Sequence, residues 1–300
     1  MTRSSSLLFV LLFIFLFTPV TWSQKVIVLG NLQDGGSPQY SCELECCMFP
    51  QPNEFVSSIG VYSDTSAILI DATPDLVSQA QYLERISRLP LKGIFLTHAH
   101  MGHYTGLVHL GREAANTKST AVFAMPRMWE FLSNNGPWNQ LLELENIRLK
   151  PLYNNKTIRL DNHIGITPLL VPHRDEFSET VGFLISGVHK KLLYIPDIDK
   201  WSVWNLSLEQ VLKEVDFALI DGTFLKDGEL NRPMSEIPHP FIIETTSLLD
   251  ALKTKEKNKV WFTHFNHTNP VRFKSNKDRE KLEAEGYHFV SFGTEFNLGD

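Results

Sequence analysis

Short apolar runs, each closed by a turn residue or a charge, recur along most of the chain and predict a mixed α/β protein. Strands are predicted at 25–30, 55–62, 66–71, 93–96, 121–125, 147–152, 157–160, 164–171, 180–186, 191–195, 217–220 and 259–263. Apolar residues at helical spacing predict helices at 74–89, 104–115, 127–134, 242–252 and 276–284. Because no internal repeat or linker divides this pattern, it favours two β-rich halves with helices outside, folded as one unit.

The first residues have the pattern of an export signal. A positively charged start, an unbroken apolar run at 7–17 and small residues at 21 and 23 predict a signal peptide over 1–23, cleaved before Gln24. The alternative is a retained membrane anchor, but a spanning helix needs about 20 apolar residues. We therefore expect a single mature domain over 24–300 that is secreted or periplasmic and has no membrane span after cleavage.

Composition narrows the class of partner. The apolar content of 43% and charged content of 21% are ordinary for a globular protein, and the net charge is −6. A general nucleic-acid binder would be basic, so we expect a small-molecule substrate and no nucleic acid. Oligomeric state does not follow from the sequence.

Three histidines follow the predicted strand at 93–96. His98, His100 and His103 lie at the carboxyl end of this strand, where α/β proteins place ligand sites. His98 and His100 are two residues apart, so they share one face in an extended backbone. Imidazole is a common metal ligand, and the cluster predicts a metal site rather than an accidental histidine-rich loop.

Other strands also end in aspartate or histidine. A polar residue after one apolar strand is usually a turn former or helix cap, but five such ends carry only these two residue types. We therefore expect them to join the three histidines around one or two divalent metals, Zn²⁺ first and Fe²⁺ second. The five are Asp71, His173, Asp197, Asp221 and His264.

The cysteines leave two alternatives open. Cys42, Cys46 and Cys47 are the three cysteines of the chain. Export favours disulfides, but an odd number with two adjacent members would give at best one disulfide and a free thiol. The other alternative is a structural zinc held by the three thiolates and one distant histidine.

The order of these residues resembles the metallo-β-lactamase fold superfamily, a four-layer αββα sandwich. Its metal motif is H-x-H-x-D-H, followed by a lone histidine, a bridging aspartate and a last histidine. The resemblance implies that Asp71 braces the metal loop by hydrogen bonding, and we expect the same supporting role of Asp221. The implied metal ligands are His98, His100, His103, His173, Asp197 and His264.

A closer similarity is to the branch of that superfamily that contains pyrroloquinoline-quinone biosynthesis protein B. The segments that carry it are 28–39, 42–47, 221–224 and 264–270. In that branch the cysteine cluster holds a structural zinc, so the resemblance places zinc ahead of the disulfide. His267, or else His264, is the implied fourth ligand.

The chain departs from both patterns. Gly102 stands where the superfamily motif has its aspartate, which leaves the second metal with His103 and Asp197, and with His264 unless that residue serves the structural zinc. Asp199 is a candidate substitute, or else a surface residue of the turn after Asp197. The biosynthesis protein typically lacks the first two histidines of the motif, and this chain has both.

Three functions are compatible with this residue set. The first is hydrolysis of an ester, amide, lactone or phosphodiester by a metal-bound hydroxide, with Asp197, His103 and His239 in catalytic positions. His239 either contacts substrate or simply precedes the helix at 242. The second is non-haem iron redox chemistry related to quinone-cofactor formation. The third, supported by Gly102, is a degenerate fold kept as a binding protein.

Overall fold

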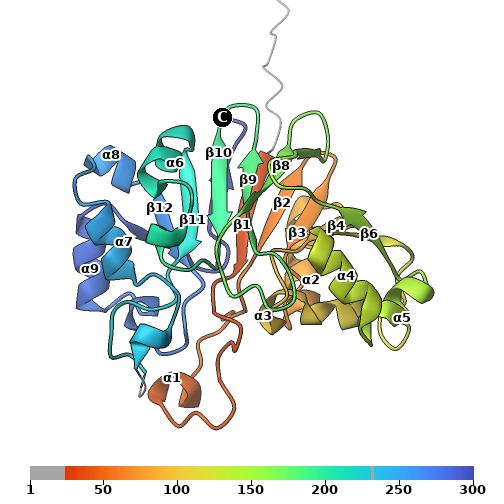
Figure 1. Ribbon diagram of the computed structural model, residues 1–300, viewed down its shortest axis with the longest axis horizontal. Coiled ribbons are helices and arrows are strands. Elements are labelled where there is room, and N and C mark those ends of the chain that lie inside the picture. Colours follow the sequence, from red (N-terminus) through yellow and green to blue (C-terminus); the bar gives the residue numbers. More distant parts are fainter. Residues whose placement is uncertain (1–23, 231–232) are drawn as a thin grey trace, which may run out of the picture.

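The computed structural model describes residues 24–230 and 233–300, so the signal peptide predicted over 1–23 lies outside the described residues. Two seven-stranded sheets form its centre (Figure 1). The first has the order β14 (Glu295–Asn297), β1 (Gln24–Gly30), β2 (Ser58–Ser63), β3 (Ala67–Ile70), β4 (Leu91–Phe95), β5 (Thr120–Ala124) and β6 (Ile147–Pro151). The second has the order β13 (His288–Phe289), β12 (Val260–Thr263), β11 (Phe217–Asp221), β10 (Lys191–Ile195), β9 (Val181–Ser186), β8 (Gly165–Leu170) and β7 (Ile158–Arg159).

Helices cover the outer face of each sheet. In Figure 1 the helices α2 to α5 lie on one side of the strands, and α6 to α9 lie on the other. The bounds on the first side are α2 (Leu76–Ser87), α3 (Met101–Tyr104), α4 (Pro126–Asn134) and α5 (Trp138–Glu143). Those on the second side are α6 (Leu208–Glu214), α7 (Ile242–Leu248), α8 (Thr254–Lys257) and α9 (Lys277–Ala284). The expected αββα arrangement is therefore confirmed.

Side-chain alternation along the strands divides the core into three layers. In β1, Val26 and Val28 pack between the sheets, while Ile27 and Leu29 belong to the layer beneath the helices of the first side. Such a strand is buried on both faces, which explains its near-continuous apolar sequence. The second sheet packs its outer face against α6, α7 and α9 in the same way.

Parallel pairing brings the ends of several strands to one edge. The strands β3 to β6 pair in parallel, and so do β10 to β13. Their carboxyl ends therefore lie together. The short helix α1 (Glu45–Met48) lies beyond the end toward which β10 runs (Figure 1).

Some predicted elements differ in the structure. The helix expected at 104–115 is instead α3 followed by a 3₁₀ segment, Thr105–Leu110. Gly106 packs so closely on the chain that an added Cβ would lie 1.9 Å from the carbonyl oxygen of Thr73, which constrains the path of this segment. The helix expected at 242–252 ends at Leu248, and the hairpin strand expected from residue 55 begins at Ser58. None of the helices in the described part of the chain is long and apolar enough to cross a membrane.

Candidate metal centre

The polar residues that follow the strands meet at this shared edge. Asp71 follows β3, the 97–103 segment follows β4, Asp197 follows β10 and His264 follows β12. Asp71 and His264 adopt left-handed backbone conformations, with φ of 70° and 61°. Non-glycine residues in this region cluster at functional sites, because the surrounding structure must hold them there.

The first donor group consists of His98, His100 and His173. His98 Nε2 lies 2.9 Å from His100 Nδ1, and Asp197 approaches both His98 and His173 at 3.7 Å. The rings of His98 and His173 are buried, whereas His100 is half-buried. Three imidazoles converging in this way are the set expected of a catalytic zinc site with open positions.

The second donor group consists of Asp34, His103, Asp197 and His264. Asp197 Oδ2 lies 3.0 Å from the Nε2 atoms of both His103 and His264. Asp34 Oδ1 lies 2.9 Å from His103 Nε2 and 3.5 Å from His264 Nε2. Asp197 thus stands between the two donor groups, in the position of a bridging carboxylate.

Hydrogen bonds to outer residues decide which nitrogen each histidine presents. Asp71 accepts from the backbone and hydroxyl of Thr97 and from His103 Nδ1, at 2.7–2.9 Å, which leaves His103 Nε2 free. The single hydroxyl proton of Thr97 goes to Asp71, so this oxygen accepts from His98 Nδ1 at 2.9 Å and leaves His98 Nε2 free.

Hydrogen bonds orient the other histidines in the same way. Thr223 donates its hydroxyl proton to Asp221, so its oxygen accepts from His264 Nδ1 at 3.0 Å. The Nδ1 atom of His173 donates to Asp199 at 3.1 Å. His100 is reversed, because its Nε2 faces Glu176 at 3.1 Å and its Nδ1 faces His98. Each ring therefore presents one nitrogen to a donor group and holds the other on an oxygen.

Five of the donor atoms form no hydrogen bond with the protein. Buried polar atoms are almost always hydrogen-bonded, and an unpartnered one requires an explanation. The unpartnered buried atoms of these groups are Asp34 Oδ1, His103 Nε2, His173 Nε2, Asp197 Oδ2 and His264 Nε2. All five face a donor group, and they are the types that bind Zn²⁺ or Fe²⁺. The residues present fit divalent metal ions.

The electrostatic environments of the two groups differ. Burial lowers the pKa of His98 and of His100, so these rings are neutral at pH 7. Burial also opposes charge on His103, but the carboxylates of Asp71 and Asp34 outweigh it and raise its pKa well above the usual value. For His264, Asp197 outweighs burial and raises the pKa to about 10. The second donor group thus holds its histidines protonated when no cation is bound.

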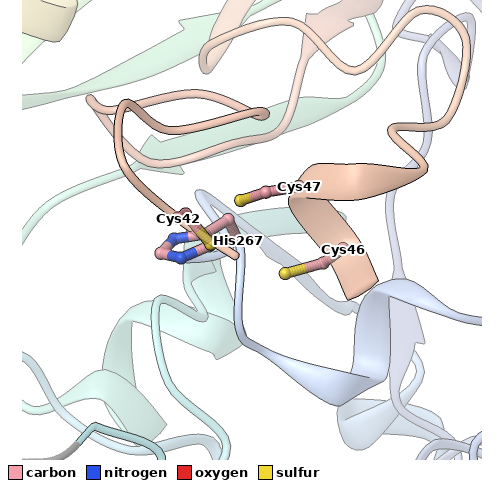
Figure 2. Close-up of side chains that lie close together, drawn as sticks. All are labelled: Cys42, Cys46, Cys47 and His267. Atoms are coloured by element: carbon pink, nitrogen blue, oxygen red, sulfur yellow. The ribbon is translucent and has the colours of Figure 1, made fainter. Parts of the chain in front are cut away.

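A separate group lies around His267, three residues after His264. Figure 2 shows Cys46 and Cys47 of α1, together with Cys42 from the preceding loop, close to His267. The potential ligand atoms lie within 4.8 Å of one another, the cysteines are free thiols, and His267 Nδ1 is buried without a partner. This cysteine group has the Cys₃His composition of structural zinc sites. Of the two histidines considered for it, His267 lies with the cysteines and His264 lies in the second donor group.

A cleft of about 550 Å³ opens beside the donor groups. His239 and Thr223 line it on the side of the donor groups, while Arg174 brings a positive charge and Glu236 a negative charge to its wall. His239 Nδ1 lies 2.7 Å from Asp221 and 3.6 Å from Asp197. His239 therefore lies between the cleft and the donor groups, three residues before α7 begins at Ile242.

The structure brings together most of the predicted site residues and adds others. His98, His100, His103, His173, Asp197 and His264 converge, and Asp71 and Asp221 lie behind histidines, as expected of supporting residues. Asp199 contacts His173 but does not enter the second donor group, so it is not the substitute carboxylate. Sequence reasoning missed Asp34 and Glu176, whose positions no strand-end pattern indicates.

Comparisons with known proteins agree with this architecture. Residues 66–265 match the family model described as the beta-lactamase superfamily domain. The coenzyme PQQ synthesis protein B of Rhizobium meliloti (strain 1021) is 26% identical, over 91% of this chain and 98% of that protein. That of Methylobacterium radiotolerans is also 26% identical, over 91% of this chain and 100% of that protein.

Solved structures show the same fold. The Zn²⁺-bound PqqB from Methylobacterium extorquens superposes with a TM-score of 0.75 at 23% identity, over 91% of this chain and all of that one. A diphosphatase from the PhnP family has a TM-score of 0.65 at 21% identity, over 92% of this chain and 98% of that one. The resemblance to the superfamily and to its coenzyme PQQ synthesis protein B branch is confirmed.

Proposed function

The chain belongs to the β-lactamase superfamily, and on that premise we propose that it is a hydrolase that uses two divalent metal ions. One observation carries the proposal. Two donor groups share Asp197, and five of their buried ligand atoms have no protein partner. Leaving this many polar atoms unpaired in a folded protein is costly unless a cation joins them.

The residues fit zinc best. Nitrogen predominates in the first donor group, and imidazole with carboxylate is the usual ligand set of catalytic zinc. When bound, such ions supply a hydroxide nucleophile at neutral pH and polarise a carbonyl or phosphoryl oxygen. Asp197, between the groups, would supply a carboxylate to the ions held by both.

His239 is placed to handle the proton of the leaving group. Its Nδ1 is held by Asp221, and its ring lines the cleft. Burial opposes charge on this ring, but Asp221 outweighs burial and raises the pKa of His239 above its usual value. The ring therefore carries a proton near neutral pH, as a general acid must.

Arg174 favours a substrate with a negative group. It lies beside His173 in sequence and on the wall of the cleft. A guanidinium recognises phosphate and carboxylate through paired hydrogen bonds. Of the ester, amide, lactone and phosphodiester classes, phosphodiesters therefore come first, since two-metal sites also suit phosphoryl transfer.

An iron-dependent redox function is the second candidate. Histidines with one carboxylate also bind non-haem Fe²⁺, and the curated relatives are named for coenzyme PQQ synthesis. Metal analysis of protein purified with and without oxygen separates iron from zinc. The proposal of a degenerate binding protein loses its main support, because Asp34 supplies a carboxylate beside Gly102.

The hydrolase proposal is tested with the full-length chain against a phosphodiester, a lactone, a thioester and a β-lactam. We expect turnover of at least one, loss of turnover on chelation and recovery with Zn²⁺. His98→Ala should abolish turnover, whereas His189→Ala, in the exposed turn at the other end of β10, should not. Full activity of His98→Ala or of the metal-free protein would refute the proposal.

We also propose that the protein is exported. The support is the apolar run at 7–17 followed by small residues. Amino-terminal sequencing of the mature protein from its native source should begin at Gln24. A mature protein that keeps Met1 would contradict export through a cleaved signal.

A further inference from the structure

We propose that Asp34 is a ligand of the second metal ion and takes the place of the aspartate that the superfamily motif carries at position 102. The inference rests on the two-metal centre proposed above. It assigns a ligand from a different part of the chain, 68 positions before the glycine.

Backbone hydrogen bonds place Asp34 next to the second donor group. The chain leaves β1 and runs beside the segment that follows β12. Phe265 N donates to Asn31 O at 2.7 Å, and Gln33 N donates to Phe265 O at 2.9 Å. Asn31 also donates its side-chain amide to Val290 O at 2.9 Å. Asp34 is therefore positioned by the same segment that carries His264.

The far end of the same loop is also held. Cys42, Cys46 and Cys47 converge on His267, three residues after His264. Both ends of the 31–47 segment thus lie beside the chain that follows β12, and zinc in the cysteine group would fix the second end. A ligand on a loop held at both ends is presented with little freedom, which is what a metal site requires.

Gly102 leaves the space that Asp34 fills. A Cβ at position 102 would lie 2.5 Å from Asp34 Oδ1, 2.6 Å from its Cα and 2.8 Å from its Cγ. Contacts this short do not occur between real side chains, so any other residue at 102 would displace Asp34. Gly102 does not have a positive φ, so the backbone does not demand glycine there. Glycine is required at position 102 because Asp34 packs against it.

The charges and contacts of Asp34 agree with a cation. Its Oδ1 approaches the free nitrogens of His103 and His264 and has no hydrogen-bond partner. Asp197 directs its own carboxylate at the same two nitrogens. Two carboxylates and two imidazole nitrogens that face one point form a ligand set for a divalent cation, which would take the place of the two imidazole protons.

The test counts metals and measures their affinity, and it does not depend on turnover. Full-length protein is loaded with Zn²⁺, analysed by elemental analysis and titrated against a chromophoric chelator. We expect wild type to hold two ions in the donor groups and one in the cysteine group, which serves as an internal control. Asp34→Asn keeps the shape but lowers the charge, and it should weaken the second ion by roughly 100-fold or more, since loss of even an outer partner typically costs 10–100-fold.

The exchange variant makes the test specific. Asp34→Gly combined with Gly102→Asp restores the motif of the superfamily, and it should bind the second ion more tightly than Asp34→Gly alone. Gly102→Ala should weaken the second ion in the wild-type background, because the added Cβ would displace Asp34. Asp227→Asn, on the exposed loop after β11, is the matched control and should bind all ions normally.

The outcomes separate this inference from the proposed function. Wild-type affinity for the second ion in Asp34→Asn would overturn the role of Asp34 and leave the two-metal hydrolase standing. Failure of wild type to bind a second ion in the donor groups would overturn both. Unchanged affinity of Gly102→Ala for the second ion would show that Asp34 does not need the space at position 102. It would overturn the inference that Asp34 replaces the motif aspartate.

Discussion

Filling the two donor groups with Zn²⁺ should release different numbers of protons. Metal binding requires neutral imidazole, so a ring that is protonated beforehand must lose its proton. In the first donor group, burial lowers the pKa of His98 and His100, and neither ring has a proton to lose at pH 7. In the second, the carboxylates overcome burial and raise the pKa of both His103 and His264.

The difference has a definite size. The second ion should displace one proton from His103 Nε2 and one from His264 Nε2, because the Nδ1 atoms keep their bonds to Asp71 and Thr223. Asp197 contributes none, because His264 and His103 outweigh burial and hold the pKa of its carboxyl well below the usual value. Each displaced proton changes the affinity about tenfold per pH unit, or about 1.4 kcal/mol. Affinity of the second ion should therefore rise about 100-fold per pH unit near neutral pH, and that of the first should rise less steeply.

Calorimetric titration in buffers of different ionisation enthalpy counts the protons directly. His264→Ala retains the first donor group, and His98→Ala retains the second. In protein whose cysteine group already holds its zinc, we expect about two protons released per further Zn²⁺ in His98→Ala and fewer in His264→Ala. Zn²⁺ affinity should rise with pH and not fall. His264, whose pKa is raised to about 10, carries a proton at neutral pH, and the metal ion must displace this proton. Equal proton release in both variants would refute the electrostatic contrast between the two groups.

Three further substitutions test the supporting residues. Asp71→Asn should weaken the second ion by roughly 10–100-fold in chelator competition, because His103 loses the carboxylate that orients it; unchanged affinity would contradict this. His239→Ala should lower kcat by roughly 100-fold or more. In wild type, kcat should fall at high pH, because the proton that Asp221 stabilises on His239 is lost as the pH rises through the raised pKa, and the variant should lack this fall. A variant whose pH–rate profile keeps the wild-type shape would exclude His239 as the general acid. Cys47→Ser should remove one equivalent of zinc and lower the thermal midpoint by about 2–4 °C for each kcal/mol of stability lost, while the other two ions stay bound; three ions in this variant would refute the cysteine site.

Much of the fold could be predicted from hydrophobic patterning. Strands such as β1 and β10 are apolar on both faces because each lies between a second sheet and a layer of helices, and this gives long apolar runs with sharp ends. Helix α6 was missed, although Ser207 is its N-cap and accepts from Gln210 N, a signal present in the sequence. The segment after α3 was predicted wrongly because its periodicity is helical, while Gly106 must pack on the carbonyl of Thr73.

The site was predictable to the extent that its residues end parallel strands. Asp71, Asp197 and His264 follow buried strands. Parallel pairing brings the ends of such strands to one edge of a sheet, regardless of the conformation of the loops. Glu176 had no such signal, because it lies in a loop and reaches His100 only through the fold. The choice between His267 and His264 beside the cysteines also needed the fold, since only the packing of α1 against the segment after β12 places His267 there.

Asp34 shows that comparing a motif position by position misses a ligand that comes from another part of the chain. Reading position 102 alone, glycine in place of aspartate means a lost ligand and favours a degenerate site. In three dimensions the same glycine is the one residue that lets Asp34 reach His103 at 2.9 Å. Glycine at that position therefore indicates that another chain segment packs there, because alanine or serine would leave no room for it. In a related chain that lacks the motif aspartate, glycine at that position should accompany an acidic residue in the loop after the first strand, and a bulkier residue there should accompany loss of the second ion.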